Sequence, residues 1–138
     1  MTPVFLDTGY ILALELANDQ HHRDATEHWA SIAAALPPLV TTTFVVGEVL
    51  AFFNTRGYHE KAILIGSRIL ESRGVDVVSV DRPLFDLAWS YFQRHDDKRY
   101  SMTDCISFIV MQQRGIVTAL TFDKHFRQAQ FQTEPTVK

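Results

Sequence analysis

The chain has a single cysteine, no long apolar run and no excess of basic residues. Cys105 has no second cysteine to pair with, so an internal disulfide is impossible and a reducing cytoplasm fits. No apolar run approaches the roughly 20 residues that span a bilayer. No basic segment followed by an apolar one opens the chain, so we expect no signal peptide, and we expect no membrane among the partners. The formal net charge of −3 argues against nucleic-acid binding through a bulk positive field.

The composition is that of one globular domain. The 138 residues are 46% apolar and 21% charged, which is enough for a real core and typical of a soluble fold. We expect a single domain over residues 1–134 and a short tail at 135–138, disordered after Pro135.

Short apolar runs alternate with stretches of helical periodicity along the whole chain. We expect strands at 4–6, 39–42, 75–80 and 116–120, an edge strand near Phe131, and helices at about 10–16, 22–35, 44–54, 60–72, after Asp81-Arg82-Pro83, and at 103–114. This alternation predicts an α/β fold with a central parallel sheet covered on both faces.

Several local details follow from the same patterns. Gly9 is expected to turn the chain between the first strand and the first helix. Thr43 is expected to cap the helix at 44–54, and Asp81 is expected to cap the helix that it precedes. Gly115 is expected to end the helix at 103–114. The helix at 103–114 would open at Thr103-Asp104, with Ser101 as the alternative cap.

Four acids occupy positions where the fold would bring them together. Asp7 and Asp123 follow apolar strands, and the carboxyl ends of parallel strands share one edge. Asp104 lies at the start of the helix at 103–114, and this helix comes directly before the strand at 116–120. The start of that helix, and with it Asp104, should therefore lie at the edge of the sheet where Asp123 lies. Glu48 lies three or four residues from apolar side chains in its helix, where a carboxylate is costly unless it is paired or bound to a cation.

Clustered carboxylates without histidine or cysteine partners favour a hard divalent cation. Repelling carboxylates either take up protons or bind a cation, and oxygen ligands suit Mg²⁺ or Mn²⁺. Such an ion can activate water and hold phosphoryl oxygens, which is the chemistry of phosphodiester hydrolysis. Thr8, Ser101 and Thr121 stand beside three of the acids, and their hydroxyls would orient a carboxylate or a bound water.

Each acid taken singly has a structural explanation. Asp7 and Asp123 would each cap a helix or turn, and Asp104 would favour the dipole of the helix that it opens. Glu48 would form an ion pair with an arginine. The functional interpretation depends on the four converging at one edge of the sheet.

At these residues the sequence resembles the PIN-domain ribonucleases, especially the VapC-type toxins of toxin–antitoxin pairs. The resemblance covers nearly the whole chain and lies in four segments in order: Phe5-Leu6-Asp7-Thr8, Val46-Gly47-Glu48-Val49, Ser101-Met102-Thr103-Asp104-Cys105, and Thr121-Phe122-Asp123-Lys124-His125-Phe126. Cys105 departs from the small residue usual at its position, and we expect it to be a buried packing residue.

The resemblance implies a three-layer α/β/α PIN-like fold and a Mg²⁺- or Mn²⁺-dependent endoribonuclease. It implies Asp7, Glu48, Asp104 and Asp123 as the acidic cluster, with Thr121 and Thr8 in support. It also implies an RNA substrate, a small antitoxin that occludes the site, and a homodimer. Two alternatives stay open: a non-toxin PIN nuclease in RNA processing, and a PIN-like scaffold that binds RNA or a partner without cutting.

Other residues are weaker candidates. Arg99 and Lys124 flank the acids in sequence and would hold RNA phosphates, although a solvated surface explains either one alone. His125 would touch the substrate or serve in packing, and the adjacent His21 and His22 point apart on a helix, which argues against a metal pair.

Two other phosphate-handling classes fit less well. A receiver-type domain needs a lysine at the end of a late strand, where Thr121-Phe122-Asp123 stands. A haloacid-dehalogenase-like phosphatase needs a second acid two residues after Asp7, where Gly9 stands.

Overall fold

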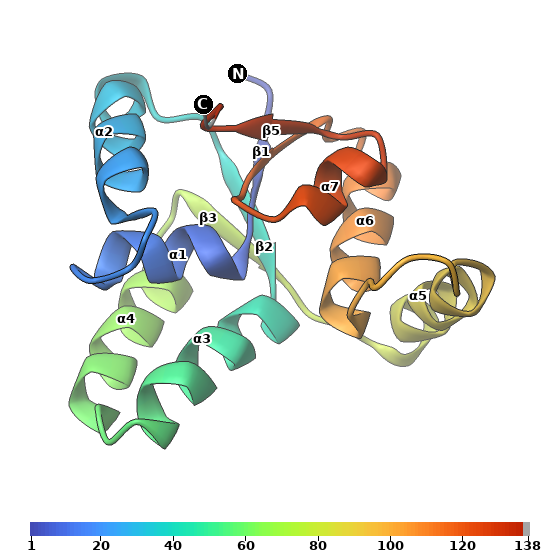
Figure 1. The fold of residues 1–138 in the computed structure, drawn as a ribbon, viewed down its shortest axis with the longest axis horizontal. Coiled ribbons are helices and arrows are strands. Elements are labelled where there is room, and N and C mark those ends of the chain that lie inside the picture. The colour runs from blue at the N-terminus through green and yellow to red at the C-terminus, as the bar shows by residue number, and fades with distance from the viewer. Residues whose placement is uncertain (137–138) are drawn as a thin grey trace.

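The computed structural model describes residues 1–136, and its centre is one parallel sheet (Figure 1). The strands are β1 (Val4–Leu6), β2 (Leu39–Thr42), β3 (Val75–Val78), β4 (Thr118–Leu120) and β5 (Gln132–Glu134). They lie in the order β3-β2-β1-β4-β5, and every neighbouring pair is parallel. The predicted edge strand near Phe131 is β5, so the α/β class with a parallel sheet is confirmed.

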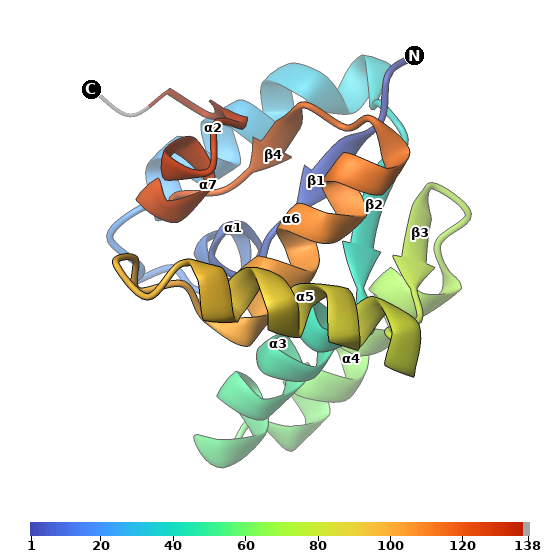
Figure 2. The same cartoon turned by 90° about the vertical axis from the view of Figure 1, so that its right-hand side faces the viewer.

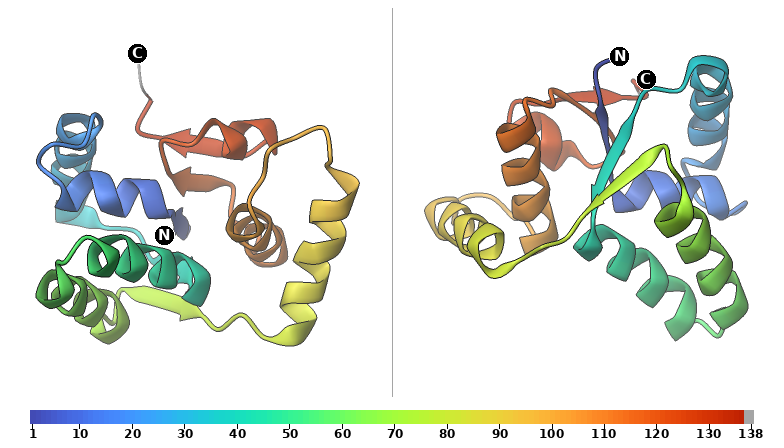
Figure 3. Two further views of the ribbon diagram at one scale, coloured as in Figure 1. Left: turned by 60° about the horizontal axis from the view of Figure 1, so that its bottom comes forward. Right: turned by 180° about the vertical axis from the view of Figure 1, so that it is seen from behind.

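The helices cover both faces of the sheet. They are α1 (Thr8–Glu15), α2 (His22–Ile32) with the 3₁₀ turn η1 (Ala33–Ala35), α3 (Thr43–Thr55), α4 (His59–Glu71), α5 (Arg82–Arg94), α6 (Met102–Arg114) and α7 (Lys124–Gln128). Figure 3 (right) shows α1 to α4 on one side of the sheet and α5 and α6 on the other. This is the predicted three-layer α/β/α arrangement.

The direction of the chain across the sheet reverses between β1 and β4. From β1 the chain proceeds outward to β2 and β3, then returns over the other face through α5 and α6 to β4 (Figure 2). Right-handed crossovers put the first set of helices on one face and the return helices on the other. The carboxyl ends of β1 and β4 therefore form a topological switch point, where open α/β sheets bind ligands.

The core consists of the central strands and the inner faces of the helices. Phe5 in β1 and Ala119 in β4 are fully buried partners in register. In α6 every residue from Thr103 to Met111 is buried, because this helix lies between the sheet and α5. Cys105 is one of these buried residues, as predicted.

Helix capping differs from the prediction at two places and agrees at two. Gly9 lies inside α1, because that helix already begins at Thr8, so it makes no turn. Thr42, not Thr43, caps α3, since its hydroxyl oxygen accepts the N–H of Val45. Asp81 caps α5 as predicted, and Gly115 ends α6 in the left-handed conformation with φ 66°.

The C-terminal prediction is only partly covered by the structure. The last strand ends at Glu134. The boundary between a domain at 1–134 and a tail at 135–138 stays a prediction, and residues 137–138 lie outside the described residues. Within residues 1–136, no helix combines the length and apolar character that crossing a membrane requires.

Candidate active site

Asp7 lies at the switch point, at the end of β1. Asp7 is 6% exposed, and the hydroxyl of Thr121 donates a hydrogen bond of 2.7 Å to its Oδ2. Asp7 occupies the N-cap position of α1, yet its side chain makes no capping hydrogen bond. The structural explanation by capping therefore does not account for Asp7.

Thr121 connects Asp7 to the segment that follows β4. Its oxygen, while donating to Asp7, accepts the backbone N–H of Asp123 at 2.9 Å. Thr121 is 2% exposed, so this bridge is shielded from water. The predicted supporting role of its hydroxyl has a geometric basis, because the hydroxyl fixes the carboxylate of Asp7 relative to Asp123.

Asp104 lies in the first turn of α6 and is 8% exposed. Ser101 caps this helix, as the alternative prediction had it: its hydroxyl accepts the N–H of Asp104 at 3.0 Å, and Asp104 Oδ2 accepts the N–H of Ser101 at 3.1 Å. This reciprocal capping box sets the orientation of the Asp104 side chain. Asp104 thus has the predicted structural role at the helix start while also facing the other acids.

His125 joins Asp104 to Asp123. Its Nδ1 lies 3.0 Å from Asp104 Oδ2 and 3.3 Å from Asp123 Oδ1. An imidazole with its proton on Nδ1 would donate to these carboxylates when they are ionised, and one with its proton on Nε2 would offer Nδ1 to a bound ion. Asp123 Oδ1 also accepts the N–H of His125 at 2.9 Å, and so caps α7. The sequence analysis did not identify His125 as a member of the acidic cluster. The signal that could have done so is its position two residues after Asp123.

Glu48 is placed differently from the prediction. We expected a carboxylate among apolar neighbours, but Glu48 is exposed, because α3 buries Val45, Val49 and Phe53 on another side. Its Oε1 accepts a 2.7 Å hydrogen bond from the hydroxyl of Thr8, the residue after Asp7. Glu48 therefore lies at the carboxyl edge of the sheet beside the acidic cluster, held there by Thr8.

The protonation of the buried acids reflects their burial and mutual repulsion. Burial raises the pKa of Asp7 to about 7, opposed by the Thr121 hydrogen bond and increased by the charges of Asp104 and Asp123. Burial also raises the pKa of Asp104, with the Ser101 backbone hydrogen bond opposing it and Asp123 adding to it. The raised pKa values of Asp7 and Asp104 mean that their ionised forms are costly here, and a bound cation would stabilise those forms.

The side chains at this site suit a divalent metal ion. Asp104, Asp123 and His125 each offer one ligand atom, and these atoms lie within 4.8 Å of one another. The hydrogen bonds to the two carboxylates fall on Asp104 Oδ2 and Asp123 Oδ1, which leaves their other oxygens for an ion. Carboxylate oxygens suit Mg²⁺ and Mn²⁺, and imidazole is better tolerated by Mn²⁺.

Arg99 and Lys124 are both exposed near this site. Arg99 lies in the loop before α6, and Lys124 is the first residue of α7. Their positions place two cations on segments that carry Asp104 and Asp123.

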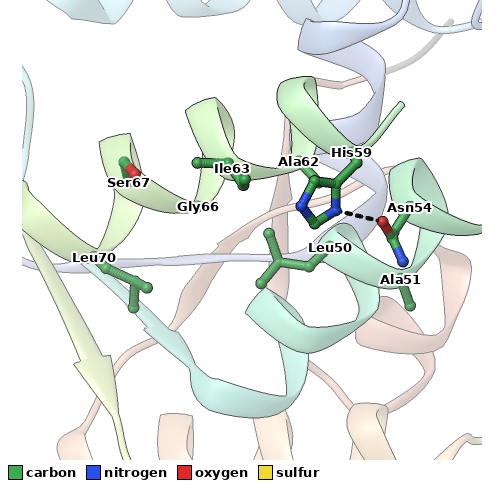
Figure 4. Close-up of a pocket in the computed structure, with 9 residues that line it drawn as sticks. All are labelled: Leu50, Ala51, Asn54, His59, Ala62, Ile63, Gly66, Ser67 and Leu70. Carbon is green, nitrogen blue, oxygen red and sulfur yellow. Dashed lines mark hydrogen bonds between the residues drawn. The ribbon is translucent and has the colours of Figure 1, made fainter. Parts of the chain in front are cut away.

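One apolar groove on the surface is separate from the acids. It lies between α3 and α4, and Figure 4 shows Leu50, Ile63 and Leu70 lining it, with His59 bonded to Asn54 at its end. The cavity volume is about 410 Å³. No acid of the predicted site lines this groove, so it is a surface feature distinct from the candidate active site.

A parallel sheet with buried acids at its switch point and a cation-suited cluster defines an α/β protein of the nuclease type. The sequence profile of the PIN domain matches residues 4–132, and the chain belongs to the PIN-domain family. This membership confirms the resemblance drawn from the four sequence segments.

Two further comparisons place the chain within the family. It is 38% identical over 129 residues to a Mycobacterium tuberculosis protein named 23S rRNA-specific endonuclease VapC20, covering 93% of this chain and 95% of the relative. The crystal structure of M. tuberculosis VapC20, described as a sarcin–ricin loop cleaving toxin, superposes with a TM-score of 0.83 at 36% identity, covering 93% and 95% of the two chains.

More distant structures share the fold. A toxin–antitoxin complex from Klebsiella pneumoniae matches with a TM-score of 0.58 at 13% identity, covering 88% of this chain and 87% of that chain. At this identity the match shows the α/β/α arrangement alone.

Proposed function

We propose that this protein is a metal-dependent endoribonuclease and the toxin of a type II toxin–antitoxin pair. The observation that carries the proposal is the meeting of Asp7, Asp104 and Asp123 at the switch point of a PIN-family sheet. A stabilising role alone does not explain Asp7, since burial of its carboxylate is costly and it caps nothing.

The proposed roles follow the placement of the side chains. Asp7, Asp104, Asp123 and Glu48 would hold Mg²⁺ or Mn²⁺. Thr121 and Thr8 through their hydroxyls, and Ser101 through its backbone N–H, would hold the carboxylates in position. Such an ion, when bound, lowers the pKa of water and neutralises charge on the phosphoryl oxygens. Arg99 and Lys124 would contact phosphates on either side of the acids.

Cation binding and the protonation of Asp7 are coupled in this proposal. With a pKa of about 7, Asp7 is only partly ionised at neutral pH without an ion. A divalent cation would favour the ionised form and release a proton on binding. We therefore expect metal affinity to rise with pH across the neutral range.

The proposed substrate is a structured RNA with an accessible loop. The relative at 38% identity is named for 23S rRNA, and the matching crystal structure is described by its cleavage of the sarcin–ricin loop. A hairpin RNA carrying that loop is therefore the first substrate to test. The formal charge of −3 means that attraction to RNA must come from local cations, not from the whole surface.

The proposed partners are an antitoxin and a second copy of the chain, in the cytoplasm where RNA is available. Large apolar side chains are exposed on α4 and α5; these are Ile63, Leu64, Leu70, Leu87, Trp89 and Phe92. Trp89 and Phe92 stack at 5.7 Å on the outer side of α5. Apolar surface of this kind is typical of interfaces, which supports an assembled protein.

The cleavage test uses the purified full chain and the hairpin RNA. We expect cutting with Mg²⁺ or Mn²⁺, loss of cutting with EDTA, and recovery when the metal is restored in excess. Chelator-resistant cutting by clean protein would refute the metal mechanism, and absence of any RNA cleavage with either metal would refute the nuclease.

A further inference from the structure

A second, smaller cavity adjoins the acids on the side of the sheet edge near β5. It has a volume of about 230 Å³, and its lining includes Asp123 and Thr121 of the site together with His21, Phe122 and Arg127. Clefts that hold drug-sized ligands measure roughly 300–1,000 Å³, so this cavity has room for about one planar ring system.

A stack of three aromatic rings reaches the wall of this cavity from the core. Tyr10 is fully buried, and its ring stacks on Phe122 at 5.9 Å with an angle of 14° between the planes. Phe122 in turn stacks on the imidazole of His21 at 4.4 Å and 1°. Phe122 and His21 are half-buried, so the series ends at the cavity with a ring oriented parallel to those beneath it.

The segment that carries His21 is fixed by hydrogen bonds on both sides. The N–H of His21 donates to Asp19 Oδ1 at 2.7 Å, and His22 Nδ1 bonds the carbonyl of Ala13 at 2.7 Å. Below the stack, the Tyr10 hydroxyl bonds His28 at 2.8 Å. These bonds fix the backbone around His21, and stacking on Phe122 orients its ring, so less freedom would be lost when a ligand binds.

The ring nitrogens of His21 are available to bind a ligand. None of the hydrogen bonds among residues 1–136 uses its ring nitrogens, and no buried side-chain nitrogen or oxygen in that range lacks a partner. The ring nitrogens are therefore open to solvent at the cavity. Arg127, which is exposed and lines the same cavity, adds a cation within the same surface.

These features match the chemistry of an unpaired nucleobase attached to a phosphate. Proteins bind single-stranded RNA by stacking splayed-out bases on aromatic or histidine rings and by contacting phosphates with arginine. We propose that this cavity is a subsite for one unpaired base of the RNA next to the cleaved bond, stacked against His21, with Arg127 on a neighbouring phosphate. The proposal rests on the proposed nuclease function.

The test measures RNA binding separately from cleavage. Full-length protein is titrated in EDTA against the fluorescein-labelled hairpin RNA of the cleavage test, and affinity is read from fluorescence anisotropy. His21→Ala is expected to weaken binding about fivefold to hundredfold, whereas His21→Phe, which keeps a stacking ring, stays within about threefold of wild type. His59→Ala, an exposed histidine in α4, is the matched control and should leave affinity unchanged.

A modified RNA identifies the base. A single abasic ribose is placed at each loop position in turn. At one position the missing base should weaken binding by the wild-type protein but should not weaken binding by His21→Ala any further.

The salt dependence of binding tests the role of Arg127. Arg127→Ala should reduce the slope of log affinity against log salt by about one, and Arg73→Ala, at the opposite edge of the sheet, should not. Thermal unfolding of each variant separates loss of binding from loss of fold.

The outcomes distinguish the two proposals. Wild-type protein that cuts the hairpin while His21→Ala, still folded, binds and cuts it equally well would overturn the subsite alone. Wild-type protein that neither binds nor cuts the hairpin would overturn both the subsite and the nuclease. Weaker binding by folded His21→Ala with rescue in His21→Phe would support the subsite whether or not cleavage is seen.

Discussion

The hydroxyl of Thr121 donates a 2.7 Å hydrogen bond to the carboxylate of Asp7, although the two residues lie 114 positions apart. The bond links the ends of β1 and β4, the two strands between which the chain reverses direction across the sheet. It also orders the acids, because the same oxygen accepts the N–H of Asp123.

Replacing Thr121 by valine should impair activity without unfolding the protein. Valine keeps the shape of the side chain but loses both hydrogen bonds, so Asp7 is free to rotate. Loss of a residue that orients a metal ligand typically reduces affinity or activity by about 10- to 100-fold. The measurement is kcat/KM on the hairpin RNA, with Thr118→Val, at the start of β4, as the control. Equal activity of the two variants would contradict the role of the hydroxyl.

Replacing Asp7 by asparagine should abolish cleavage and raise stability. The amide oxygen can still accept from Thr121, while the cost of a buried, repelled charge disappears. Without metal at pH 8, we expect the variant to unfold at a higher temperature than wild type. Asp24→Asn, an exposed acid in α2, is the control for a generic charge change. Cleavage by Asp7→Asn at the wild-type rate would remove Asp7 from the active site.

The stability of the metal-free protein should fall as the pH rises from about 4 to about 7. Asp7 has a pKa raised from 3.8 to about 7 in the folded protein, so the folded state binds more protons than the unfolded state over that range. The contribution of Asp7 to the free energy of unfolding therefore decreases as the pH rises through this range. The decrease is about 1.4 kcal/mol for each pH unit between the pKa of the unfolded state and that of the folded state. Urea unfolding at several pH values in EDTA measures the slope. It should be shallower in Asp7→Asn; equal slopes in the two proteins would show that Asp7 is not the group responsible.

Removing the His125 side chain should weaken metal binding. Its Nδ1 contacts both Asp104 and Asp123, so the ring either ligates the ion or orients the two carboxylates. In both cases His125→Ala should lower Mn²⁺ affinity about 10- to 100-fold. Isothermal titration calorimetry with Mn²⁺ checks this, with His59→Ala as a histidine control. An unchanged Mn²⁺ affinity would assign His125 to helix packing.

Local features were predictable because they depend on residues close together in the chain. The strand at Leu39–Thr42 and the cap at Asp81 follow from short apolar runs and from a side chain bonding three residues ahead. Where two threonines are adjacent, as Thr42 and Thr43 are, the sequence pattern alone does not decide which one caps α3; the structure shows that it is Thr42, so the prediction of Thr43 is wrong.

Exposure of a helical side chain was harder to predict. Glu48 has apolar residues three and four positions away, which suggested a shared buried face. The exposed position of Glu48 depends on how α3 is rotated against α1 and α4, and this rotation is set by packing between helices. The hydrogen bond from Thr8 to Glu48, 40 positions apart, follows from the same packing.

The amino-acid sequence by itself determined the alternation of strands and helices, the family, and the acids at the ends of apolar strands, because these are properties of periodicity and of residue type at given positions. Only the tertiary structure decided that β1 lies beside β4, that Thr121 bonds Asp7, and that the ring of His21 stacks on Phe122. The physical reason is that such contacts join distant segments, so they exist only after the order of strands and the packing of helices have fixed the segments in space.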